Sequence, residues 1–103
     1  MTGNSSFTLA LAGDVSVKSA QDMLGRLKEA VAAHPVITLD TSDVTQADVT
    51  TVQSILAARS TADALGKSMT MKGPLAPKLQ AVLEGAGFLN PAQPAARFWT
   101  ELT

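Results

Sequence analysis

The sequence contains no cysteine and a single histidine, His34. The absence of cysteine excludes disulfides, thiolate metal sites and cysteine nucleophiles. One histidine gives no basis for a metal centre. The Gly-x-x-x-x-Gly-Lys-Ser/Thr loop that binds nucleotide phosphates is also missing. We therefore expect neither a metal nor any other cofactor.

Excess charge and long apolar stretches are missing as well. Eight Lys and Arg residues and nine Asp and Glu residues give a net charge of −1, and they are scattered along the chain. This pattern offers no basic patch for nucleic acid or an anionic membrane. No apolar run approaches the ~20 residues that cross a bilayer, and the N-terminus does not resemble a signal peptide. We expect a cytoplasmic protein that neither binds nucleic acid nor inserts into a membrane.

What the sequence does contain is enough apolar residues for one core. A chain of 103 residues with 46% hydrophobic content has the size of a single domain. We expect a flexible N-terminus over residues 1–6, a folded domain over residues 7–89 and a tail over residues 90–103. In the tail, Phe98 and Trp99 predict a short helix that docks on the folded domain.

A strand, a polar loop and a helix form the centre of the chain. The apolar, β-branched run Val36–Leu39 is typical of a buried strand. The polar residues that follow, 40–47, predict a loop, and Asp48 is placed to cap the next helix. That helix is predicted by apolar residues at roughly helical spacing, which are Val52, Ile55, Leu56, Ala62 and Leu65.

The remaining elements alternate in the same way. We predict strands over 7–11 and 67–72, and helices over residues 19–33 and 75–83. Ser16 or Ser19 would open the first helix, with Asp22 completing a capping box after Ser19. The order β-α-β-α-β-α predicts an α/β fold with at least partly parallel strands. Three visible strands are few, so residues 1–6 hold a fourth or one sheet edge is open to a partner.

The same residues resemble the STAS domain, found in anti-sigma factor antagonists, sulfate transporters and some lipid-transport and stressosome proteins. The resemblance covers residues 7–89 and includes a strand ending in Gly-Asp and a Leu-Gly-Lys before the third strand. It rests on Leu11, Gly13, Asp14, Leu39–Thr41, Val44, Asp48, Val52, Leu56, Leu65, Gly66, Met69, Met71 and Leu83. It implies a small, mostly parallel or mixed sheet of about four strands, with helices mainly on one face.

The resemblance also implies a non-enzymatic role in bacterial signal transduction through protein–protein interaction. The partner would be a kinase-like or anti-sigma protein, and phosphorylation would release it. The family's phospho-acceptor position falls on Thr50, with Thr51 as the neighbouring candidate. The family pattern is altered here, because Val49 replaces a small residue and Thr51 replaces glycine. The candidate partner-binding residues are Asp40, Asp48, Thr50, Thr51, Gln53, Ala57, Ser60 and Thr61.

Simpler roles remain open for these residues. Thr50 would also suit a helix start as a capping-turn residue, and Asp40 would tie down its own loop. His34 would complement the dipole at the end of a helix. Nothing in the sequence brings His34 near Ser42 or Ser54 to form a catalytic triad. A second function is a constitutive STAS-type subunit or adaptor of a lipid-transport ATPase or signalling complex, without phosphorylation.

Overall fold

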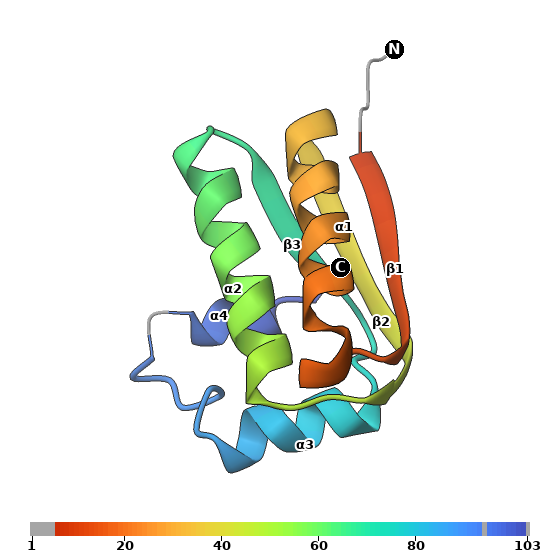
Figure 1. Cartoon of the computed structure of the whole chain (residues 1–103). Helices are drawn as coiled ribbons and strands as arrows, with labels where there is room; N and C mark the ends of the chain where they lie inside the picture. The colour runs from red at the N-terminus through yellow and green to blue at the C-terminus, as the bar shows by residue number, and fades with distance from the viewer. Residues whose placement is uncertain (1–5, 94, 103) are drawn as a thin grey trace.

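The computed structural model of the chain describes residues 6–93 and 95–102. Helices and strands follow each other in the predicted order, and Figure 1 shows them from the side of the two longest helices. In chain order the elements are β1 (Ser6–Asp14), the 3-10 turn η1 (Val17–Ser19), α1 (Ala20–Ala33), β2 (Val36–Gln46), α2 (Val49–Ala64), β3 (Ser68–Lys72), α3 (Pro77–Gly85) and α4 (Ala96–Thr100).

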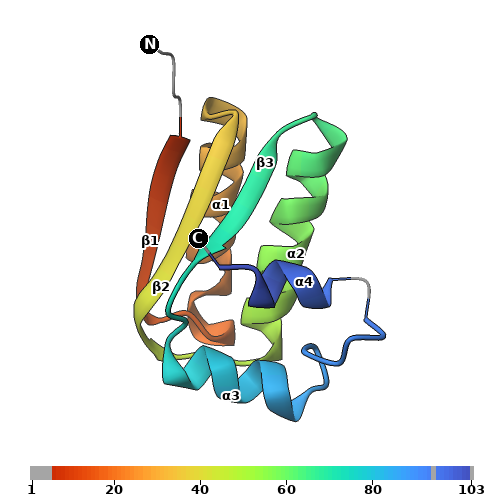
Figure 2. The same cartoon turned by 180° about the vertical axis from the view of Figure 1, so that it is seen from behind.

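The sheet has the order β1-β2-β3, and both strand pairs are parallel. Helices α1 and α2 cover one face of it, while α4 lies on the β3 side, behind α2 in Figure 1 and in front in Figure 2. This is the α/β fold that the sequence predicts. The described residues form three strands rather than about four. Ser6 belongs to β1, and the rest of the segment that was expected to hold a fourth strand lies outside the described residues.

The core lies between the sheet and the two helices that cover it. Alternating residues of each strand point into it, because successive side chains of a strand face opposite sides. On α1, the matching surface comes from buried residues that recur at helical spacing, which are Met23, Leu27, Ala30 and Val31. The residues buried here include Leu9, Leu11, Ile37, Leu39, Met69 and Met71 from the strands and Met23, Leu27, Val31, Val52, Ile55, Ala58 and Ala62 from the helices.

Strand β2 is longer than predicted. The stretch 40–46 was expected to be a loop because it is polar, but it continues the strand to Gln46. Two β-branched residues explain the difference, since Thr41 and Val44 point into the core and are 1% and 5% exposed. The polar residues between them occupy the outer face. Pairing with β1 continues past two register shifts, which absorb the extra residues of β2.

The start of α1 also differs from the prediction. The helix begins at Ala20, and Ser19 makes no side-chain capping bond, so the expected capping box is wrong. Ser16 cannot cap α1 either, because its N–H and hydroxyl both donate to Asp14. At the other end, α1 stops at Ala33 before Pro35, as predicted. The ring of His34 stacks on Phe7 with the centroids 4.1 Å apart, a contact that the predicted dipole role did not include.

The C-terminal part of the chain contains the predicted third strand, the predicted helix after it and a short helix in the tail. Gly66 ends α2 in the left-handed region (φ +73°), and Pro77 occupies the first turn of α3. In α4, Phe98 and Trp99 are buried, as the docking of a short helix requires. None of the helices in the described part of the chain is both long enough and apolar enough to cross a membrane.

Candidate partner-binding site

The candidate site lies where the carboxyl ends of β1 and β2 meet the first turn of α2. Side chains gather at such an edge because parallel strands end together and a helix begins there. The backbone N–H of Val15 donates to the carbonyl oxygen of Gln46 at 2.9 Å and joins the two strand ends. Figure 1 shows η1 and the start of α2 side by side at the lower end of the sheet.

Asp48 is the N-cap of α2, as predicted. Its Oδ1 accepts a hydrogen bond from the N–H of Thr51 at 3.2 Å. The Thr51 hydroxyl accepts one from the N–H of Asp48 at 3.1 Å, so the two residues form a capping box. Asp48 also joins two distant segments, because its Oδ2 accepts from the N–H of Val17 at 3.0 Å. The carboxylate therefore holds both the helix start and the turn after β1.

Burial separates the two candidate phospho-acceptors. Thr51 is 1% exposed, and its hydroxyl donates to the carbonyl oxygen of Val15 at 2.5 Å. A kinase reaches such a hydroxyl only after local unfolding. Thr50, the second residue of α2, is half-buried. Among the described residues, its hydroxyl has no hydrogen-bond partner. The geometry therefore gives Thr51 a structural role and leaves the hydroxyl of Thr50 available.

Two exposed valines flank Asp48. Val17 in η1 is 63% exposed, and Val49, the first residue of α2, is 43% exposed. Single exposed apolar residues are common on protein surfaces. Here, however, both are adjacent to one carboxylate, since Val49 follows Asp48 in the chain and Val17 donates to it. The result is a small apolar surface around a fixed negative charge.

A second carboxylate lies at the end of β1. The hydroxyl and N–H of Ser16 both donate to Asp14, at 2.5 and 2.9 Å. These bonds, with a smaller contribution from the positive charge of Lys18, hold the pKa of Asp14 below its usual value. Asp14 is therefore ionised at neutral pH. Within the described residues, no group of three or more His, Asp or Glu side chains could hold a metal ion.

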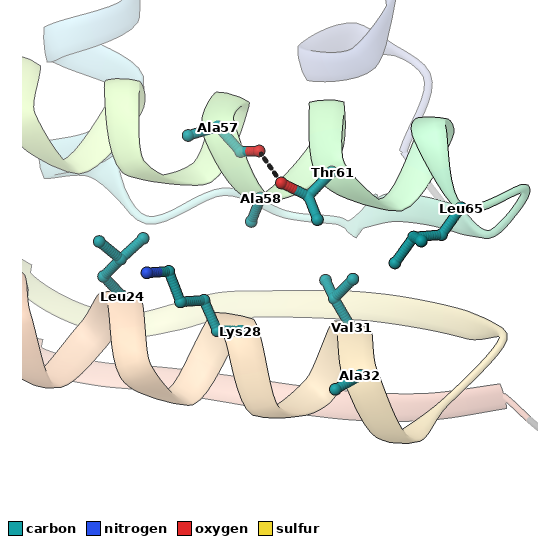
Figure 3. Close-up of a pocket in the computed structure, with 8 residues that line it drawn as sticks. All are labelled: Leu24, Lys28, Val31, Ala32, Ala57, Ala58, Thr61 and Leu65. Carbon is teal, nitrogen blue, oxygen red and sulfur yellow. Dashed lines mark hydrogen bonds between the residues drawn. The ribbon is translucent and has the colours of Figure 1, made fainter.

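The other residues predicted on α2 share its exposed side. Gln53, Ala57, Ser60 and Thr61 are all exposed. Ala57 and Thr61 also line a cavity of about 230 Å³ between α1 and α2, and Figure 3 shows the Thr61 hydroxyl donating to the Ala57 carbonyl there. The opposite wall comes from α1 and is formed by Leu24, Val31, Ala32 and the aliphatic stem of Lys28. Ala58 and Leu65, on the α2 side, complete a lining that is mainly apolar.

Asp40 does not join this group. It alternates with the buried Leu39 along β2, so it faces the side of the sheet opposite α1 and α2. Its Oδ1 accepts from the N–H and the hydroxyl of Ser42, which hold its pKa below the usual value, and Lys72 lies 3.8 Å from Oδ2. These contacts fit the simpler role considered for Asp40, in which its side chain holds the neighbouring backbone in place.

Sequence reasoning did not include Val15 and Val17 in the site. Both lie in the turn after β1, where only a strand break at Gly13-Asp14 was recognised. That break was nevertheless a usable signal, because the carboxyl ends of neighbouring parallel strands share one edge. It indicated that the residues after Asp14 lie near those after β2.

Comparisons with known proteins agree with the fold described above. A family model described as "Mlab, STAS domain" matches residues 2–90. The anti-sigma factor antagonist SpoIIAA in its unphosphorylated form is similar in fold, with a TM-score of 0.64, 16% identity and coverage of 84% of this chain and 76% of that one. The phosphorylated form of SpoIIAA, a Bacillus cell fate determinant, gives a TM-score of 0.62 and 16% identity, over 84% of this chain and 79% of that one. No curated protein sequence matches the chain. With a family model covering most of its length, the chain belongs to the STAS domain family.

Proposed function

We propose that the chain is a non-enzymatic regulatory module that binds a protein partner through the start of α2, in the manner of an anti-sigma factor antagonist. One observation carries this proposal. Asp48 is bonded to two segments of the chain and is flanked by the exposed Val17 and Val49. Thr50 follows two residues later, and its hydroxyl has no hydrogen-bond partner among the described residues. Rigid, partly apolar surfaces with a fixed charge suit protein recognition. The exposed side of α2, with Ala57 and Thr61 at the cavity, extends the contact surface.

Phosphorylation of Thr50 would act on binding rather than on the fold. A phosphate adds about −1.5 to −2 charges at neutral pH. The dipole at the N-terminus of α2 favours that charge, while the nearby carboxylate of Asp48 opposes it. These effects offset each other, so the helix start tolerates the modification. A partner seated over Val49 and Asp48 would meet a new hydrated dianion and dissociate.

Mass spectrometry tests the switch. The purified chain is incubated with ATP and its cognate kinase-like protein, and the phosphorylated residue is mapped. We expect phosphate on Thr50, because no described residue bonds its hydroxyl, and none on Thr51, which is buried and bonded to Val15. Thr50→Ala is the matched control and should abolish the modification. Phosphate elsewhere, or none, would contradict the switch while leaving partner binding to be tested on its own.

A second function is favoured by a different observation. The matching family model carries the name Mlab, and the helix start differs from the antagonist pattern at Val49 and Thr51. Both features suit a constitutive subunit of a lipid-transport ATPase or signalling complex, in which Thr50 has no switching role. The neighbouring genes discriminate the two functions. A kinase-like anti-sigma gene favours the switch, and a transport ATPase gene favours the constitutive subunit.

A further inference from the structure

Within residues 6–93 and 95–102, nothing protects the outer edge of β1 in the way that is usual for an edge strand. β1 is nine residues long and pairs with β2 alone among the described elements. From Phe7 to Ala12 it contains no charged residue and no proline. Natural proteins commonly protect such edges with charges, proline or a covering element, because unpaired backbone groups recruit another strand. The opposite side of the sheet is different, since α4 packs beside β3, whereas Figure 2 shows no other labelled helix or strand of the described residues beyond β1.

Only one backbone group of this edge has a partner from elsewhere in the described chain. Nη2 of Arg26 donates to the carbonyl oxygen of Ala10 at 2.9 Å. Backbone groups alternate in direction along a strand, so Thr8 and Ala12 present their N–H and C=O groups on the same side as Ala10. A strand that pairs with β1 would use these groups, and Arg26, which is exposed, would be free to swing away.

A recess also lies on the helix side of the edge. A cavity of about 260 Å³ opens there, lined by apolar surface from Phe7, Leu9 and Ala30 and by the charged side chains of Arg26 and Glu29. An added strand would cover this cavity and extend the apolar layer between the sheet and α1. The recess therefore fits an occupant that brings apolar side chains together with charges complementary to Arg26 and Glu29.

We propose that the occupant is a second copy of this chain, paired antiparallel through β1 about a two-fold axis near Leu9. Two contacts align α1 with β1, since Arg26 reaches Ala10 and His34 stacks on Phe7. By that alignment, the level of Leu9 on β1 corresponds to the segment of α1 that carries Arg26 and Glu29. A two-fold axis there places Arg26 opposite the partner's Glu29 and repeats the pair by symmetry. The same side chains are thus complementary to their own copy.

Charge reversal tests this arrangement in the full chain. Sedimentation velocity is measured for the parent, Arg26→Glu, Glu29→Arg and the double variant, up to about 1 mM protein. We expect a concentration-dependent dimer for the parent. Each single variant should weaken it about tenfold or more, because both symmetric contacts become repulsive. The double variant should restore it. Circular dichroism checks that all four proteins are folded.

Ala10→Pro provides an independent test of the strand edge. Proline removes the outward N–H of Ala10, so the variant should remain folded but lose the dimer. A parent that stays monomeric up to about 1 mM overturns the proposal. So does a dimer that ignores the charge reversals, or one that the double variant fails to restore. These outcomes are separate from partner binding at α2, because β1 lies at the edge of the sheet and Arg26 and Glu29 lie outside the candidate site.

Discussion

Replacing Thr51 with valine tests how the start of α2 is held. The Thr51 hydroxyl donates to the carbonyl oxygen of Val15 at 2.5 Å and accepts from the N–H of Asp48 at 3.1 Å. The side chain is 1% exposed, and valine has nearly the same shape. The substitution therefore removes two hydrogen bonds without opening a cavity. It leaves one carbonyl oxygen and one N–H without a partner from the protein.

The magnitude follows from the burial of these two groups. An unsatisfied buried polar group costs about 1–3 kcal/mol. The bond to Val15 is buried, whereas the bond from Asp48 is only partly buried, so the second group contributes less. We expect Thr51→Val to lower the free energy of unfolding by about 2–3 kcal/mol. Thr51→Ser keeps the hydroxyl and loses one methyl group, so its cost should be about 1 kcal/mol.

Urea denaturation followed by circular dichroism measures these differences, provided that the slopes agree among the variants. Thr50→Val is the matched control, because the Thr50 hydroxyl has no partner among the described residues. Its free energy of unfolding should stay within about 0.5 kcal/mol of the parent. A Thr51→Val protein as stable as this control would refute the structural role of Thr51.

Two further predictions concern the carboxylates of the site. Asp48→Ala removes the bonds to Thr51 and Val17 and should cost about 1–2 kcal/mol in the same urea titration, while Asp48→Asn keeps a capping oxygen and should retain most of the stability. Equal losses in the two variants would contradict the capping role. Ser16→Ala removes the hydroxyl bond to Asp14, so the pKa of Asp14 should rise toward its usual value in an NMR titration. Because the pKa of Asp14 is lower in the folded protein than in the unfolded chain, its carboxylate stabilises the fold at pH values above the unfolded pKa. This contribution is lost as the pH falls through the pKa of the folded protein. The variant should therefore lose less stability than the parent on acidification, and an unchanged pKa would contradict this reasoning.

Features determined by local sequence were predictable. The cap at Asp48 depends on one side chain and the N–H groups that follow it, and the structure has it as predicted. The end of α1 at Ala33, before Pro35, has a similarly local cause. Helix α1 itself was predictable, because helical periodicity reports burial directly.

Features determined by tertiary contacts were not predictable in the same way. The stretch 40–46 looked like a loop because its outer residues are polar, and only pairing with β1 makes it a strand. The bonding of the Thr51 hydroxyl, which separates it from Thr50, depends on the carbonyl of Val15, and Val15 is distant in sequence. Ser19 looked like a cap, but the bonds between Ser16 and Asp14 shape the turn before α1.

Partner affinity as a function of charge at Thr50 tests the proposed binding surface most directly. Isothermal titration with the cognate partner protein would compare the parent with Thr50→Ala and Thr50→Glu. Thr100→Glu is a matched control, since it places the same charge on α4, behind α2 in Figure 1. We predict that Thr50→Glu binds at least about tenfold more weakly, a loss of about 1.4 kcal/mol. Thr50→Ala and Thr100→Glu should bind like the parent. Binding of Thr50→Glu at the affinity of the parent would contradict the account.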